Sequence, residues 1–199
     1  MKILKYIIFV LIALVFLFLA IGFLKPSVNY GHEIIVDKTM KEAWAVHQDE
    51  TKLGQWLEGF KSIDLISGEP GNVGSKYKVI VNPGEGQPDF EMIETIVSKK
   101  DADHIQLSFD SEMMLFDQTT TFSEKDGKIT IKTDSNVKGK GMMIRSIFAL
   151  MEMFGGSFKT QEAKNLEALK KVINENTTNY FPAPNVMENN LKEATRMTN

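Results

Sequence analysis

Residues 141–174, GMMIRSIFALMEMFGGSFKTQEAKNLEALKKVIN, are the segment on which the fold depends, and their periodicity is helical throughout. The first half is apolar on almost every side, and the second half narrows to an apolar stripe with lysine and glutamate opposite. A helix that is apolar all round is buried or lines something apolar. The segment is therefore predicted to be a long closing helix that packs on another apolar surface.

Gly155 and Gly156 interrupt this helical pattern. Each glycine in a helix costs about 1 kcal/mol relative to alanine, so the pair needs an explanation. One interpretation is a kink or a close helix contact. The other is a hinge that lets the first half of the helix move as a gate.

The apolar surface on which this helix packs is predicted upstream, in segments where apolar and polar residues alternate. Strand-like segments lie near residues 60–68, 75–82, 89–98, 104–111, 114–123 and 128–137. Glycine, proline, asparagine or aspartate clusters separate them, and those at 83–86 and 124–127 are strong hairpin signals. Strands joined by hairpins and apolar on one face need a cover. An antiparallel sheet that packs on the closing helix is the expected result.

Before these strands, residues 29–37 are predicted to form one more extended segment. Asp37 or Thr39 could cap a helix whose apolar side carries Trp44 and His47, and a second short helical piece begins at Asp49. The order is strand, two small helices, a run of antiparallel strands and one closing helix. This order predicts a single α+β domain over residues 29–176.

The N-terminus carries eighteen consecutive apolar residues, 7–24, after a short flank at residues 1–6. As a helix they would span roughly 27 Å, close to the thickness of a bilayer's hydrocarbon core. A cleaved secretory signal is the alternative, but its apolar stretch is usually shorter and ends at small residues. We expect an uncleaved single-pass membrane anchor. Lys2 and Lys5 outweigh Lys25 in the flanks, which predicts a cytoplasmic N-terminus and an extracytoplasmic domain.

Composition excludes several classes of function. The formal net charge of −3 with mixed signs offers no basic footprint for nucleic acid. The chain has no cysteine, which excludes disulfides, a thiolate nucleophile and a cysteine zinc site. Residues 177–199 are polar and contain Pro182-Ala-Pro184, so they are expected to form a tail outside the core.

Several segments resemble one superfamily in the order that it uses them. Residues 34–44, IIVDKTMKEAW, are similar to the first strand and helix of the START-like, polyketide cyclase/dehydrase and Bet v 1-type (SRPBCC) proteins. Residues 49–60 resemble the second helix and the approach to strand two, and residues 68–77 resemble the turn into strand three. Residues 158–171 resemble the end of the C-terminal helix. The resemblance covers residues 29–176.

This resemblance implies a helix-grip fold, in which a curved antiparallel sheet wraps around the long C-terminal helix and encloses a hydrophobic cavity. Members of the superfamily bind lipids, sterols, hormones and polyketides, and a minority catalyse reactions on them. The N-terminal membrane helix is a departure from the simplest members. Since it lies upstream of the domain, it leaves the predicted fold unchanged.

The chain is rich in methionine and phenylalanine, with 11 and 13 residues respectively, which suits an adaptable apolar surface. An ordinary filled core would explain the same residues. If there is a cavity, its expected apolar lining is Tyr77, Val79, Phe109, Phe116, Phe148 and Met151. Gln118 and Thr120 would offer polar contacts that orient a ligand.

Signals for catalysis are weak. His32, His47 and His104 are far apart and lack a metal-ligand spacing, so each is expected at the surface or in a strand, and no metal or cofactor is predicted. Glu94 is the one carboxylate of interest. In one strand register it shares the inward face with Ile96, where burial would raise its pKa and suit it to acid–base chemistry. The opposite register places Glu94 in water.

Together these features predict a membrane-tethered START-like domain that binds, and could transfer, a hydrophobic small molecule or lipid without catalysis. The first alternative is a cyclase/dehydrase-type enzyme acting on a hydrophobic substrate. The second is a protein-interaction module with a filled core. The expected partners are the apolar ligand and the membrane, with no nucleic acid, and the sequence identifies no protein partner.

Overall fold

The structure is a computed structural model that describes residues 2–82, 84 and 86–182. Its elements follow the order α1 (Lys2–Leu24), β1 (Val28–Val36), α2 (Met40–Gln48), a 3-10 turn η1 (Glu50–Lys52), α3 (Leu53–Trp56), β2 (Phe60–Ser67), β3 (Lys76–Val81), β4 (Phe90–Lys100), β5 (His104–Asp110), β6 (Met114–Lys125), β7 (Lys128–Gly139), α4 (Met142–Gly155) and α5 (Ser157–Asn174). The boundaries of β2–β7 agree within two residues with the six segments predicted from alternation.

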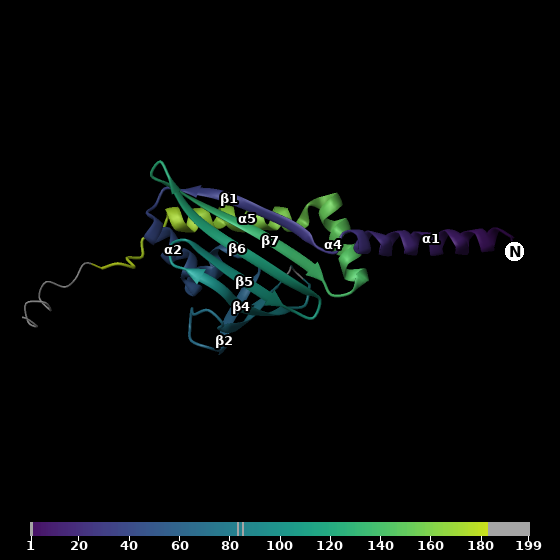
Figure 1. Ribbon diagram of the computed structural model, residues 1–199, viewed down its shortest axis with the longest axis horizontal. Coiled ribbons are helices and arrows are strands. Elements are labelled where there is room, and N and C mark those ends of the chain that lie inside the picture. The colour runs from purple at the N-terminus through teal and green to yellow at the C-terminus, as the bar shows by residue number, and fades with distance from the viewer. Residues whose placement is uncertain (1, 83, 85, 183–199) are drawn as a thin grey trace, which may run out of the picture.

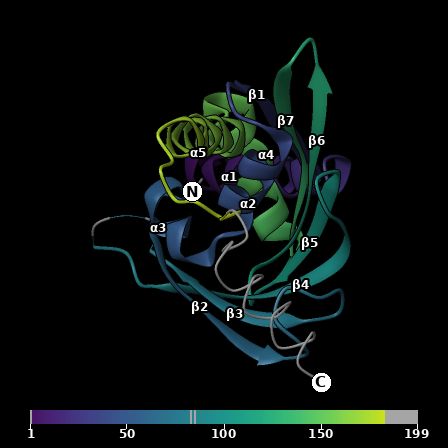
Figure 2. The ribbon, with the colours of Figure 1, turned by 90° about the vertical axis from the view of Figure 1, so that its left-hand side faces the viewer.

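The strands form one antiparallel sheet of seven strands in the order β1-β7-β6-β5-β4-β3-β2. The six strands β2–β7 pair in chain order, which makes five antiparallel pairs, and β1 pairs with the last strand, β7. The sheet curves, and the helices lie on its concave side (Figures 1 and 2). The predicted α+β helix-grip architecture is confirmed.

The core lies between the concave face and α5. Ile129 and Ile131 of β7 are buried against Leu169 and Ile173 of α5, and the aromatic ring of Trp44 on α2 joins them. Strand alternation explains the sheet side of this contact, because every second residue of β7 from Ile129 onward is buried. At α2, Thr39 is the N-cap, and its capping box with Glu42 decides between the two caps that the sequence allowed.

The closing helix is broken where the glycine pair lies. α4 ends at Gly155, α5 begins at Ser157, and Gly156 between them has a left-handed φ of 55°. The helical segment predicted over residues 141–174 is thus divided into two helices at the glycine pair, which fits the kink interpretation. Figure 1 shows α4 crossing the line of α1, whereas α5 runs along the sheet.

The N-terminal helix and the residues that follow α5 both contact the domain. α1 begins at Lys2, earlier than the predicted span, and its last turn packs on α4, where the Gly22 N–H donates to Ser146 Oγ at 3.2 Å. At the other end, Tyr180 packs against the core and its hydroxyl donates to Asp49 Oδ2 at 2.6 Å. The first residues of the expected tail thus lie on the domain, whereas residues 183–199 are outside the described part of the chain.

Candidate ligand-binding site

The expected cavity residues of the strands all lie on the concave face, and several share one cross-strand row. Tyr77 of β3 pairs with Glu94 of β4, which pairs with Phe109 of β5, and Phe109 pairs with Phe116 of β6. Glu94 therefore takes the inward of its two possible registers, between two of the expected lining residues. Gln118 lies one step further along β6 on the same face, opposite Ser135.

Packing divides this face into two parts. Tyr77 and Val79 belong to the buried core cluster, and Thr120 is buried as well. Phe109 and Phe116 are only half-buried, as is Phe148 on α4. The eight expected lining residues therefore do not form one surface: three lie in packed regions, four lie in the looser part, and Met151 is 43% exposed.

In the looser part, five aromatic rings form a chain from the sheet to α4, and we call it the aromatic chain. Its ring centroids are separated by 5.1 Å from Phe109 to Phe116, 6.4 Å from Phe116 to Tyr30, 5.6 Å from Tyr30 to Phe158 and 5.2 Å from Phe158 to Phe148. All five residues are half-buried. Such rings present apolar area at low entropic cost, which suits contact with an apolar molecule.

A polar network lies beside the aromatic chain. The Gln118 side-chain amide donates to Ser135 Oγ at 3.2 Å and to Glu162 Oε1 at 3.0 Å. Glu162 is only 8% exposed, and desolvation raises the pKa of its carboxyl. Burial, with the nearby Glu162, also raises the pKa of Tyr30. A carboxyl, an amide and hydroxyls so placed can donate to or accept from a ligand hydroxyl or carbonyl.

Glu94 is the one inward carboxyl of β4. Burial raises its pKa from the ordinary 4.5 to about 7, and the charge of Glu50 adds to this rise. A carboxyl with a pKa near neutrality can serve as a general acid or base. Among the residues that the structure describes, no three of histidine, aspartate and glutamate come together as a metal site.

The histidines differ in their surroundings. His32 and His104 lie in strands, as expected. His47 does not: it lies on α2, stacked between Trp44 and Trp56 with its ring edge-on to Phe122. Desolvation there lowers its pKa to about 4. The expectation of a surface or strand position was wrong for His47, although its helical spacing with Trp44 pointed to the apolar side.

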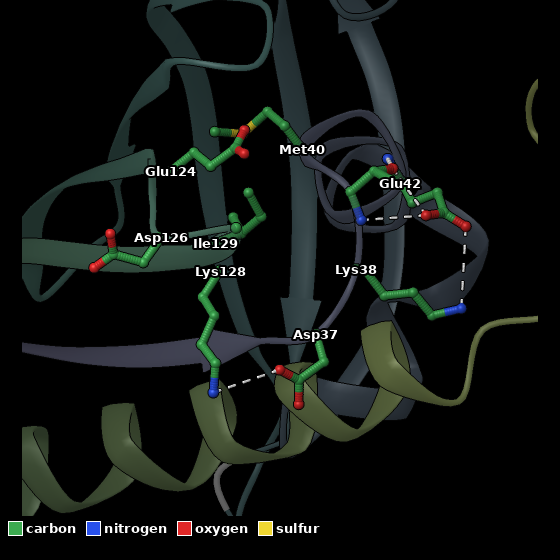
Figure 3. Close-up of a pocket in the computed structure, with 10 residues that line it drawn as sticks. Asp37, Lys38, Met40, Glu42, Glu124, Asp126, Lys128 and Ile129 are labelled. Carbon is green, nitrogen blue, oxygen red and sulfur yellow. Dashed lines mark hydrogen bonds and ion pairs between the residues drawn. The ribbon is translucent and has the colours of Figure 1, made fainter.

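Two hollows lie away from the aromatic chain. One of about 540 Å³ lies between α2 and the β6–β7 turn and is lined mostly by charged groups, with Lys128 3.9 Å from Asp37 (Figure 3). The other, of about 340 Å³, lies between α3 and α5 around Trp56. Neither is lined by any of the eight expected cavity residues. The charged lining of the first does not suit an apolar ligand.

Sequence reasoning missed three residues of the looser part, each of which had a local signal. Tyr30 is an even number of residues from the buried Ile34 and Val36 of β1. It therefore lies on the same, inward face of the strand. Glu162 precedes Leu166 by one helical turn, which places it on the buried stripe of α5. Phe158 precedes Glu162 by one more turn, so it lies on the same side of α5.

No protein-family model matches the chain, and no curated protein matches it either. Solved structures do resemble it. Ara h 8.0201 superposes with a TM-score of 0.58 at 16% identity, covering 75% of this chain and 99% of that one. Norcoclaurine synthase from Thalictrum flavum, in complex with dopamine and hydroxybenzaldehyde, gives 0.52 at 16% identity over 77% and 90%.

The di-domain ARO/CYC protein BexL, from the BE-7585A biosynthetic pathway, gives a TM-score of 0.58 at 14% identity. The match covers 77% of this chain and 52% of that two-domain protein. At such low identities the likeness establishes the fold and nothing finer. The domain that follows α1 thus has the helix-grip fold of the Bet v 1-like, START-like (SRPBCC) proteins.

Proposed function

We propose that this protein binds a hydrophobic small molecule or lipid beside the aromatic chain, between α4, α5 and the concave face, and that α1 tethers the domain to a membrane. The observation that carries the proposal is the partial exposure of this part of the grip. Five aromatic residues remain half-buried there, while the side chains in the other part of the concave face, such as Tyr77, Val79 and Ile96, are buried.

The polar network argues for an amphipathic ligand. Gln118, Ser135 and Glu162 hold polar atoms next to apolar rings, and a pure hydrocarbon would leave any group displaced from this network unpaired at a cost of about 1–3 kcal/mol. A ligand with one hydroxyl or carbonyl can replace such a contact. We therefore expect a largely apolar molecule that carries at least one polar oxygen.

Tethering suits this task. α1 is long and apolar enough to cross a membrane or to act as a signal sequence. As an uncleaved anchor it would hold the domain at the bilayer in which an apolar ligand is already concentrated. The intact mass of the protein purified from membranes tests this point. A mass that includes residues 2–24 supports the anchor, and a mass that lacks them identifies a cleaved signal.

Native mass spectrometry of the full chain, released from detergent, tests binding. We expect a retained apolar adduct in the wild type and its loss in Phe116→Ala, which removes the ring that links Phe109 to Tyr30 in the aromatic chain. Phe181→Ala is the matched control, since Phe181 is exposed and lies outside the aromatic chain. A bare wild-type mass would contradict binding and favour the interaction module with a filled core.

Catalysis of the cyclase or dehydrase kind is the second candidate, and Glu94 is the observation that favours it. Its carboxyl lies between Tyr77 and Phe109 with a pKa of about 7. A dehydrating enzyme deprived of this group would retain its substrate. The compound recovered from Glu94→Gln would then be heavier by one water than that from the wild type, whereas equal masses support binding alone.

A further inference from the structure

The outer surface of α4 is apolar where a helix in water would be charged. Its exposed side chains are Met142, Met143, Ile147, Met151, Met153 and Phe154. Met143 is 62% exposed and Phe154 81%. Globular proteins rarely leave such a contiguous apolar patch in water, and a patch of this kind marks a contact with a membrane or a partner.

The two charged residues of α4 do not face outward to offset this surface. Both are half-buried and engaged with backbone groups. Arg145 Nε donates to the carbonyl of Gly139 at 3.0 Å, and Glu152 Oε2 accepts from the Phe158 N–H at 3.0 Å. The apolar face of α4 therefore has no polar rim of its own within the helix.

The position of α1 indicates what covers this face. The last turn of α1 touches the first half of α4: besides the hydrogen bond to Ser146, a Cβ on Gly22 would lie 2.5 Å from the Met142 carbonyl oxygen. Gly22 lies two residues before the end of α1, or about 3 Å along its axis. The contact is therefore at the level where a membrane-spanning α1 leaves the hydrocarbon.

The direction of α4 fits the same surface. Figure 1 shows α1 extending from the domain and α4 running across its line at the junction. If α1 crosses the bilayer, α4 lies along the interface and not through it. Lys25 follows α1 directly and can reach lipid headgroups. The exposed Met113 lies beside the start of α4, because the Lys140 N–H donates to its carbonyl at 2.7 Å.

We propose that α4 is an interfacial helix whose exposed apolar face is buried in the surface of the bilayer that α1 spans. This inference rests on the proposed anchor and adds a docking surface to it. The opposite side of α4 carries Phe148, the last ring of the aromatic chain. One helix thus contacts lipid on one side and the binding site on the other, so a ligand can pass between them without crossing water.

Site-specific quenching tests the proposal, because a chain without cysteine accepts one unique label. The full-length protein is reconstituted in phosphatidylcholine–phosphatidylglycerol vesicles whose acyl chains carry a quencher. Fluorophores are placed at Met143→Cys and Phe154→Cys on α4, at Val15→Cys within α1, and at Lys125→Cys on the β6–β7 hairpin. We expect lipid quenching at the first three sites and quenching by aqueous iodide alone at Lys125→Cys.

The outcomes separate the two proposals. Quenching at Val15→Cys without quenching on α4 overturns the interfacial helix and leaves the anchor standing. Absence of lipid quenching at Val15→Cys overturns the anchor and the inference that rests on it. Self-quenching of the Met143→Cys label that persists on dilution into excess vesicles identifies a second copy of the chain on this face, which also overturns the inference.

A charge-substituted pair tests whether the apolar surface is the cause. With the label moved to Ile147→Cys, the double variant Met143→Glu and Phe154→Glu is expected to lose most of the lipid quenching. The matched control, Met143→Leu and Phe154→Leu, keeps it, and Val15→Cys remains quenched in both backgrounds. Unchanged quenching at Ile147→Cys in the glutamate variant, with an unaltered near-ultraviolet circular dichroism spectrum, would overturn the proposal.

Discussion

At the scale of single residues, two buried ionisable groups, Glu94 and His47, change the stability of the fold with pH in opposite directions. Glu94 is an acid whose pKa is raised to about 7, so the folded state holds its proton above pH 4.5, where the unfolded state has lost it. His47 is a base whose pKa is lowered to about 4, so the folded state stays neutral below pH 6.5, where the unfolded state is already protonated. Both shifts arise from desolvation of the charged form.

Burial of the ionised Glu94 carboxylate should lower the stability of the wild type above pH 7, and replacing Glu94 should restore that stability. Because the unfolded chain binds fewer protons at Glu94 than the folded one between pH 4.5 and 7, the contribution of Glu94 to stability falls across this window and stays low above it. The full effect is at most about 3 kcal/mol. Urea denaturation at pH 5 and pH 8 should show that Glu94→Gln gains stability relative to the wild type between the two pH values, a difference from which the opposite contribution of His47 cancels. Glu91→Gln, on the exposed side of β4, should show no such gain.

His47 should make the opposite contribution. Its part of the stability is complete above pH 6.5 and is lost as the pH falls toward 4, because protonation would place a cation among Trp44, Trp56 and Phe122. A nuclear magnetic resonance titration of the His47 ring should show a midpoint near 4 with the protein still folded. A midpoint close to 6.5 would mean that the ring is solvated and that its aromatic surroundings are open.

At the scale of elements, the break between α4 and α5 depends on one backbone conformation. Gly156 has φ of 55°, which glycine adopts freely and other residues adopt at a cost. The break matters because it turns α4 across the end of the grip and leaves α5 along the sheet. It also places the Phe158 N–H against the Glu152 carboxylate, which satisfies one of the free donors at the start of α5.

Substitution of Gly156 by alanine should therefore destabilise the protein by about 1 kcal/mol or more. Gly155→Ala is the matched control: its φ is not left-handed, so alanine there should be neutral or slightly stabilising. Thermal denaturation of the two variants measures the difference. Hydrogen exchange across residues 142–155 tests the hinge alternative, because a mobile gate requires faster exchange in the wild type than in Gly156→Ala.

At the scale of the whole molecule, the α1–α4 contact sets the domain against its N-terminal helix. Helices approach closely where one of them presents glycine, and a Cβ at Gly22 would collide with backbone atoms of Met142 and Ser146. The result is a short, fixed junction between the two parts.

Gly22→Leu should loosen the junction while the sheet remains intact. We expect faster hydrogen exchange in residues 142–155, with unchanged protection in β6 and β7, because α1 packs chiefly on α4. Ala20→Leu is the control on the same helix, since Ala20 is exposed. Faster exchange in β6 and β7 as well would show that α1 supports the whole domain and not only α4.

The sequence by itself determined the features that repeat over a few residues. Alternation located the strands, and the uninterrupted apolar run located α1. Such patterns are local, since each strand or helix carries its own period. For the cap of α2 and the register of Glu94 the sequence left two alternatives each, and the structure chose between them.

Only the tertiary structure decided what distant segments do together. The aromatic chain joins residues from β1, β5, β6, α4 and α5, and Tyr30 reaches it because β1 pairs with β7 more than a hundred residues later. The direction of α4 followed from the left-handed conformation of Gly156 and from the contact of Gly22 with Ser146. Packing between elements fixed these contacts, and no period within one element encodes them.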